Sequence, residues 1–209
     1  TSKINLNMFT GIIQSLGIIK YINNDKNTYS IKTNLSLSDC KIGSSICCDG
    51  VCLTAISIKS LGTYYLFEVN IGEETIKRSN VTNWNIGTVI NIEKSLKVGD
   101  EISGHFVYGH VDAVLHINKI VKLENSMEFE FSFKNSDNSS KFKKYIVEKG
   151  SVAINGISLT VANVFDNSFN VSVIPHTYEI TNLSILKDGD KVNIEFDPLA
   201  RYISDKYGN

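Results

Sequence analysis

The chain contains two copies of one segment. Residues 43–54 read GSSICCDGVCLT and residues 150–160 read GSVAINGISLT. Each contains an apolar run, then an Asp-Gly or Asn-Gly pair, and ends in Leu-Thr. Two further matches follow in the same order, each at an offset of 102 residues: 75–80 with 177–182, and 87–93 with 189–195. Repeats at a nearly constant offset indicate a duplicated domain, and they fix the architecture before any other feature does.

The length of the chain fits this duplication. Its 209 residues divide into two predicted domains, 8–97 and 98–197, followed by a C-terminal segment, 198–209. Two domains of about 95 residues each fall within the ordinary range. A unit of that size buries a modest core, so packing against the second copy would stabilise both.

The charge balance excludes one class of partner. There are 21 basic and 22 acidic residues, which give a net charge of −1. A nucleic-acid-binding domain normally carries a basic stripe. The sequence therefore predicts a small, nearly neutral ligand.

The four cysteines, Cys40, Cys47, Cys48 and Cys52, all lie in the first half of the chain. A secreted disulfide scaffold would spread its cysteines and carry a signal peptide. Zinc is the alternative, but the Cys48-x3-Cys52 pair has no second pair at ligand spacing. Reduced cytoplasmic thiols are therefore expected, without a metal. No apolar run is long enough to span a bilayer. Residues 1–7, before Met8, are interpreted either as a leader remnant or as residues added for expression, and they are left out of the fold prediction.

Short runs rich in β-branched and aromatic residues dominate the chain. Examples are 17–22, 64–69, 129–133 and 169–174, several of which alternate with period two. Strands with one buried face, separated by Gly, Asn and Asp turns, are typical of barrels or sandwiches. Helices are expected only at 140–146 and 198–207, the second with Asp197 as its N-cap and Pro198 at its first position.

The Leu-Thr segments suggest a pocket in each copy. Side chains two positions apart on a strand share a face. Cys52 and Thr54 therefore point to one side of the first copy, and Ser158 and Thr160 to one side of the second, with the intervening leucine pointing the other way. A solvated strand face is the plain alternative, but recurrence in both copies favours a pocket.

The segment 104–112 reads GHFVYGHVD and is predicted to be a strand. Its two histidines, five positions apart, would then lie on opposite faces, so a shared metal is not expected. One neutral histidine in a pocket would be a good proton shuttle. A core histidine bonded to the backbone is the alternative.

The two pockets are predicted to differ in their side chains. Matching residue 109 with residue 11 places His110 at the position of Ile12. From this we expect Cys52 to share one pocket with Ile12, and Ser158 to share the other with His110. Related pockets with unlike chemistry suit an enzyme that holds two copies of one molecule and treats them differently.

Taken together, these residues resemble the riboflavin synthase family, in the form built from two lumazine-binding repeats. The resemblance rests on MFTGI at 8–12, DGVCLT at 49–54, ET at 74–75 with Arg78, GHFVYGHVD at 104–112, KG at 149–150, NGISLT at 155–160, IPHT at 174–177 and NIE at 193–195. These motifs occur in order and span nearly the whole chain.

The resemblance implies an all-β fold of two tandem six-stranded Greek-key β-barrels with a short C-terminal helix. It implies a homotrimer whose active sites form between the N-terminal barrel of one subunit and the C-terminal barrel of a neighbour. The implied reaction is the dismutation of two 6,7-dimethyl-8-ribityllumazine molecules to riboflavin and 5-amino-6-ribitylamino-2,4-pyrimidinedione, with no metal or redox cofactor. Lumazine synthase is a further implied partner, whereas nucleic acid and membrane are not.

The resemblance also implies a set of site residues. Substrate contacts are expected at Gly11, Ile12, Ile13, Cys52, Leu53, Thr54, Asn70, Ile71, Gly72, Glu73, Glu74, Thr75, Gly109, His110, Val111, Lys149, Ser158, Leu159, Thr160, Ser172, Val173, Ile174, Pro175, His176 and Thr177. Proton transfer is expected from His110 with Ser158 and Thr160. Cys52 would be the nucleophile or a polar neighbour of the C7 carbon, and Ser45 also matches a polar site position. A solvated surface lysine is the alternative for Lys149.

Three other functions fit parts of the pattern. A non-catalytic relative could bind lumazine or flavin as a chromophore, but it would not need Cys52, His110, Lys149 and Ser158 together. A reductase flavin barrel would need an Arg-x-Tyr-Ser signature and a nucleotide-binding domain, which the sequence lacks. The asymmetric placement of His and Cys argues against a purely structural β-repeat.

Overall fold

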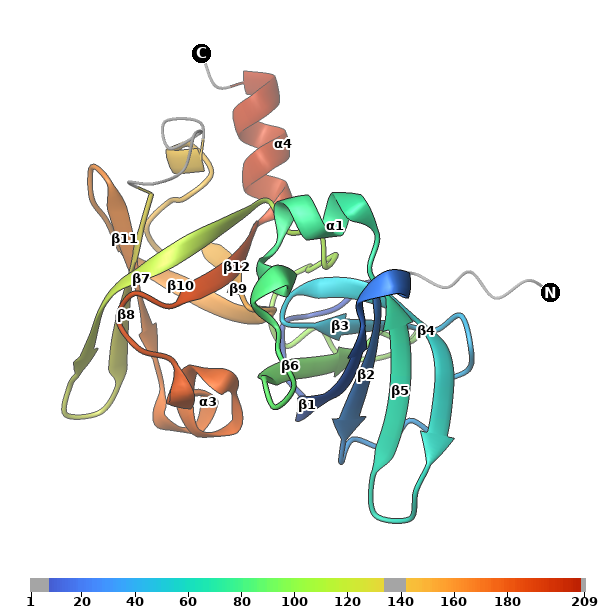
Figure 1. The fold of residues 1–209 in the computed structure, drawn as a ribbon. Helices are drawn as coiled ribbons and strands as arrows, with labels where there is room; N and C mark the ends of the chain where they lie inside the picture. Colours follow the sequence, from blue (N-terminus) through green and yellow to red (C-terminus); the bar gives the residue numbers. More distant parts are fainter. Residues whose placement is uncertain (1–7, 134–141, 208–209) are drawn as a thin grey trace.

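The computed structural model describes residues 8–133 and 142–207, which form two closed β-barrels lying side by side (Figure 1). The first barrel consists of β1 (Ser15–Asn23), β2 (Thr28–Thr33), β3 (Ser45–Cys48), β4 (Val51–Ser60), β5 (Tyr65–Asn70) and β6 (Val89–Lys94). The second consists of β7 (Ala113–Lys122), β8 (Met127–Ser132), β9 (Ser151–Ile154), β10 (Ile157–Val164), β11 (Ser168–Val173) and β12 (Lys191–Phe196).

Both barrels have the same topology. The first closes in the order β1-β2-β5-β4-β3-β6, and the second repeats that order with β7 to β12 in place of β1 to β6. All pairings are antiparallel. The prediction of two tandem six-stranded Greek-key barrels is therefore confirmed.

The alternating apolar pattern of the strands fills the barrel interiors. In β8, Phe129 and Phe131 are fully buried, whereas their neighbours Glu128 and Glu130 are only partly so. Four strands, β1, β4, β7 and β10, carry a β-bulge, and the bulges fall at repeat-equivalent positions. A bulge bends a strand and increases its twist, which helps a short sheet to close.

The helices occupy equivalent places as well. α1 (Glu73–Arg78) and the 3-10 turn η2 (Asn80–Asn83) correspond to α3 (Pro175–Ile180) and η3 (Asn182–Ile185), while the short η1 (Asn24–Lys26) links β1 to β2. α4 (Pro198–Tyr207) extends away from the second barrel (Figure 1).

The prediction for the C-terminal helix is confirmed. Leu199 N–H donates to the Asp197 carboxylate at 2.9 Å, so Asp197 is the N-cap and Pro198 the first helical residue. Of the other predicted helix, 140–146, residues 140 and 141 lie outside the described residues. Phe142 and Lys143 are helical, but residues 144–146 are not, so the helix ends earlier than predicted.

The repeat alignment needs a one-residue correction. Gly43 N–H donates to Ala55 O, and Lys149 N–H donates to the equivalent Val161 O. Lys149, rather than Gly150, therefore occupies the position of Gly43. Both residues have positive φ, 92° and 63°, and the glycine fits this conformation without the steric cost that the lysine incurs.

Buried asparagines join the two barrels. Asn91 and Asn182 exchange hydrogen bonds of 2.8 and 2.9 Å, and Asn80 N–H donates to Asn193 Oδ1 at 2.7 Å. All four residues are at most 8% exposed. Buried polar groups are costly unless they are hydrogen-bonded, so these reciprocal bonds hold the barrels in one relative position.

Asp49 breaks the symmetry of this junction, because its equivalent in the second repeat is Asn155. Asp49 Oδ1 accepts from Asn91 N at 2.7 Å and from Asn182 Nδ2 at 2.9 Å. Burial raises the pKa of Asp49 to about 8, although both hydrogen bonds oppose the rise. The folded state thus binds a proton that the unfolded chain releases near pH 4.

We therefore expect Asp49→Asn to change how stability depends on pH. Because the folded-state pKa is raised, the carboxyl lowers the free energy of unfolding as the pH rises from about 4 to about 8. An asparagine at this position would keep the acceptor oxygen, as Asn155 does, without the ionisation. The advantage of the variant over the original should grow by a few kcal/mol between about pH 5 and pH 8, measured by denaturant unfolding. A constant difference across that range would show that Asp49 does not titrate there.

Candidate active site

The predicted polar positions lie on the outer faces of the barrels. Leu53 belongs to the core of the first barrel and Leu159 to that of the second. The alternation therefore turns Cys52 and Thr54, and equally Ser158 and Thr160, away from the cores, as the sequence predicts. Thr54 and Thr160 are exposed, whereas Cys52 and Ser158 are partly covered.

What covers them is a loop that belongs to the opposite repeat. Cys52 N–H donates to Gly109 O at 2.9 Å, and Ser158 N–H donates to Gly11 O at 2.8 Å. The prediction that Cys52 shares a pocket with Ile12, and Ser158 with His110, is therefore wrong for a single chain. Within the chain, His110 lies with Cys52.

The exchange arises because two loops cross each other in antiparallel directions: the first loop, residues 8–14, and the second loop, residues 104–112. Phe9 and Val107 exchange backbone hydrogen bonds of 2.7 and 3.0 Å, so each loop passes over to the other barrel. Their apolar side chains follow: Ile13 packs in the core of the second barrel, and Val111 in the core of the first. Residues 104–112 are thus a loop with one bridge at Val107 rather than the predicted strand.

Two buried glutamates hold the crossed loops. Glu93 accepts hydrogen bonds from Thr10 N at 2.8 Å and Gly11 N at 3.0 Å. Glu195 accepts from the backbone N–H groups of Tyr108, Gly109 and His110 at 2.7, 2.8 and 3.0 Å. The sequence marks both glutamates only as part of a repeat, because nothing in the pattern indicates that they bind the loops.

Burial raises the pKa of Glu93 and of Glu195 to about 7, against the hydrogen bonds that favour the charged forms. Each carboxylate faces two or three backbone donors, which is the environment that stabilises a buried anion. The carboxylates therefore fix the backbone on which Ile12 and His110 are carried.

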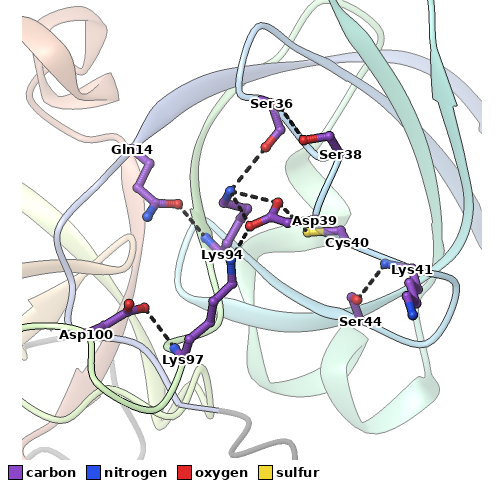
Figure 2. Close-up of polar contacts among 10 residues, drawn as sticks. All are labelled: Gln14, Ser36, Ser38, Asp39, Cys40, Lys41, Ser44, Lys94, Lys97 and Asp100. Carbon is purple, nitrogen blue, oxygen red and sulfur yellow. Dashed lines mark hydrogen bonds and ion pairs between the residues drawn. The ribbon is translucent and has the colours of Figure 1, made fainter.

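An ion-pair cluster lies beside Gln14, where the first loop (residues 8–14) enters β1. Figure 2 shows Asp39 between Lys94 and Lys97, with Gln14 Oε1 accepting from Lys94 N at 2.9 Å. The hydrogen bond from Lys97 lowers the pKa of Asp39 to about 2, with Lys94 contributing to the same effect. Exposed ion pairs contribute little stability individually. Gln14 is held separately, by the backbone N–H of Lys94 in β6.

A cavity of about 450 Å³ lies where β4, α1 and the second loop meet. Its lining residues are Val51, Cys52, Glu74, Thr75, Arg78, Ser79, Gly109, His110, Val111, Asp112 and Arg201. We call it the first cavity. It contains six of the predicted contact residues, and it adds Arg78, Asp112 and Arg201, which were not among the site residues expected from the sequence.

The thiol of Cys52 is held in its neutral form. Burial raises its pKa above the usual value, while a hydrogen bond with the Ser45 side chain opposes the rise. Ser45 lies diagonally opposite Cys52 on the β3–β4 hairpin, with its own partner Thr54 on the same face. A thiol in this setting is a polar neighbour rather than a ready nucleophile.

The second barrel carries a different group at the equivalent place. The Ser158 hydroxyl lies 2.7 Å from Nδ1 of His105, and burial lowers the pKa of His105. A neutral imidazole beside a hydroxyl is a general-base arrangement. We call Ser158, His105 and the adjoining Gly11 the second site. The expectation from the sequence places proton transfer on His110 and gives His105 no role of its own, because the predicted strand turns His105 to the opposite face.

The remaining predicted contacts lie at matching strand ends. Asn70 ends β5, Ile71 and Gly72 link it to α1, and Glu73 begins that helix. Ser172 and Val173 end β11, Ile174 links it to α3, and Pro175, His176 and Thr177 form the first turn of α3. Lys149 lies in the exposed loop before β9. The side chains of Ile71 and Val173 are buried in the cores, so only their backbones can face a ligand.

Gly109 closes the first cavity and leaves no room for a side chain. A Cβ at this position would lie 2.6 Å from both Cβ and N of Cys52, and φ is +74°. We expect Gly109→Ala to destabilise the chain well beyond the 1–2 kcal/mol or so of left-handed strain and to displace His110. Gly99→Ala is the matched control, since Gly99 has φ +99° and nothing within 4 Å. Equal losses of unfolding free energy would show that the close approach to Cys52 is unimportant.

The described part of the chain contains neither a metal-binding cluster nor a membrane-spanning helix. Among residues 8–133 and 142–207, no group of three or more His, Cys, Asp or Glu side chains could hold a metal ion. Within the same ranges, no helix has the length and apolarity needed to cross a membrane. All four cysteines are free.

Comparison with known proteins shows which family the chain belongs to. The lumazine binding domain matches twice, at residues 10–95 and 108–197. Riboflavin synthase of Brucella abortus is 39% identical over 198 residues, covering 93% of this chain and 96% of the relative. Riboflavin synthase of Saccharomyces cerevisiae is 36% identical, covering 94% and 84%.

Solved structures show the same fold. The crystal structure of LumP complexed with 6,7-dimethyl-8-(1'-D-ribityl) lumazine aligns with a TM-score of 0.73 at 22% identity, covering 90% of this chain and 98% of that one. LumP complexed with riboflavin aligns equally well. With the domain matched in both repeats and relatives of over 35% identity along nearly its full length, the chain belongs to the riboflavin synthase family.

Proposed function

We propose that this chain is a riboflavin synthase, a transferase that moves a four-carbon unit from one 6,7-dimethyl-8-ribityllumazine to another. The products are riboflavin and 5-amino-6-ribitylamino-2,4-pyrimidinedione. The observation that carries the proposal is the pair of unlike sites on equivalent barrel faces. Cys52 and His110 meet in the first cavity, whereas Ser158 meets His105 in the second site. A dismutation needs such a difference, because two identical molecules must be given opposite roles.

The side chains suit the chemistry of the reaction. The 7-methyl group of a lumazine can lose a proton, because the resulting anion is delocalised over the ring. We assign this proton transfer to His110, which is exposed in the first cavity on a backbone fixed by Glu195. The neutral thiol of Cys52 would then polarise the C7 carbon rather than attack it, with Ser45 orienting the sulfur.

Ser158, with His105, would activate the second lumazine, either directly or through a water molecule. Backbone groups beside Thr54 and Thr160 would hold the pteridine edges. Lys149 lies just before β9, and its side chain would contribute a positive charge at the edge of the β9–β10 hairpin. Holding both rings face to face would supply much of the rate through orientation.

The exchange of loops makes an intersubunit site the natural assembly. In one chain, His110 and Ser158 belong to different sites, so bringing them to one pair of lumazines requires the first cavity of one subunit to face the second site of another. Three large side chains on α4, those of Leu199, Tyr202 and Ile203, are 61%, 74% and 62% exposed. A homotrimer would cover them. We place this trimer in the cytoplasm, where lumazine synthase would supply its substrate.

The decisive test is an assay for turnover. Purified protein mixed with 6,7-dimethyl-8-ribityllumazine should produce riboflavin, followed by its absorbance, with one riboflavin formed for every two lumazines consumed. A saturable spectral shift without turnover would instead identify a lumazine-binding protein without activity.

A further inference from the structure

Asp112 ties the far end of the His110 loop to the C-terminal part of the chain. Its Oδ2 atom accepts hydrogen bonds from Phe196 N at 2.9 Å and from Arg201 Nη2 at 2.5 Å. Its own N–H donates to Ile194 O at 2.9 Å. The carboxylate is only 18% exposed, so these bonds are partly shielded from water and restrict the loop more than a surface ion pair would.

The near end of the same loop is held by Glu195, as described above. Tyr108, Gly109 and His110 all donate their backbone N–H groups to it. The His110 ring also stacks on Tyr108, with ring centroids 6.2 Å apart and planes inclined by 23°. The loop is therefore anchored on both sides of His110.

Arg201 supplies the side-chain part of the far anchor. It lies in the first turn of α4, where its N–H donates to Asp197 O at 3.1 Å. Its side chain lines the first cavity together with Cys52 and His110. In Figure 1 the base of α4 lies close to α1, which forms another wall of this cavity.

We propose that Arg201 is a positioning residue for the reaction, which fixes His110 by holding Asp112 at the end of its loop. This inference rests on the proposed function. It assigns Arg201 no contact with the reacting atoms. Loss of the ion pair would leave the far end held only by the bonds of Asp112 to Phe196 N and Ile194 O, so the loop should shift slightly there while Glu195 still holds the near end. A shift of about 1 Å in a catalytic group can lower the rate by about 10²-fold.

The test compares Arg201→Met, Arg201→Lys, Asp112→Asn and the double variant Arg201→Met/Asp112→Asn. Arg201→Met should lower kcat by about 10- to 100-fold, with KM and the dissociation constant of riboflavin, measured by fluorescence titration, within about threefold. The double variant should lose no more than either single variant, because both remove one interaction. Arg201→Lys should recover part of kcat, since it keeps the charge but not the planar geometry.

The matched control is a second ion pair of α4, between Lys144 and Asp205. Asp205→Asn removes a charge from the same helix without touching the first cavity, so it should leave kcat unchanged. Sedimentation of each variant checks that the assembly is intact.

Several results would overturn the inference. Weakened riboflavin binding with unchanged kcat would show that Arg201 contacts the ligand. Additive losses in the double variant would show that Arg201 and Asp112 act separately, and a parallel loss of kcat, binding and assembly would show a structural role. If the original protein makes no riboflavin, the proposed function fails instead, which keeps the two failures distinct.

Discussion

His110→Ala should nearly abolish riboflavin formation while leaving lumazine binding almost intact. Removing a general base typically costs 10² to 10⁴ in rate, so kcat should fall by about that range. The cavity should survive, because Glu195 binds the backbone of residue 110 rather than its ring. kcat from riboflavin absorbance and the dissociation constant of lumazine from fluorescence titration measure the two effects separately.

The control for this variant is His116→Ala. His116 lies on β7, where its Nδ1 atom is 3.3 Å from Gly189 O, and it is not part of the first cavity. Its loss should leave kcat near the original value. If His110→Ala also retains full kcat, His110 has no part in the chemistry and the proton must be taken by another group.

Two inactive variants should regain activity when they are mixed and allowed to exchange subunits. His110→Ala disables the first cavity, and Ser158→Ala disables the second site. If the active site combines one of each from neighbouring subunits, random exchange leaves roughly a quarter of the pairs intact. Riboflavin absorbance before and after exchange, with exchange confirmed by mass-tagged subunits, gives the measurement.

The matched control mixes His110→Ala with Cys52→Ala. Both changes fall in the first cavity, so no pairing restores an intact site and activity should stay at the level of the parents. The same absence of recovery in the His110→Ala and Ser158→Ala mixture, after proven exchange, would place the whole reaction within one chain.

Much of the fold follows from local sequence signals. The turns at Asp49-Gly50 and Asn155-Gly156 have positive φ at both residues, as two-residue hairpins require. The alternation of phenylalanines at 129 and 131 gives the buried face of β8. Such signals depend on neighbours along the chain, and the duplication supplies the second barrel once the first is known.

Local sequence signals do not predict which loop covers which barrel, and therefore which side chains share a site. The repeat alignment shows that Gly11 and Gly109 are equivalent, but it is silent on which barrel each loop covers. Ile13 and Val111 look like ordinary core residues of their own repeats, and only the structure shows that each packs in the other. His105 was missed for a related reason, since the two-residue periodicity of a strand was applied to a segment that is a loop.

The crossed loops also bear on where such a molecule could have come from. A single repeat would lack the core side chain that the other repeat provides, Ile13 or Val111. It would also lack the loop that covers Cys52 or Ser158, which the other repeat provides as well. A half-length ancestor could have met both needs by pairing with a copy of itself. Fusion of its two genes would then have joined an existing dimer, and only afterwards would each half have been free to accumulate its own chemistry.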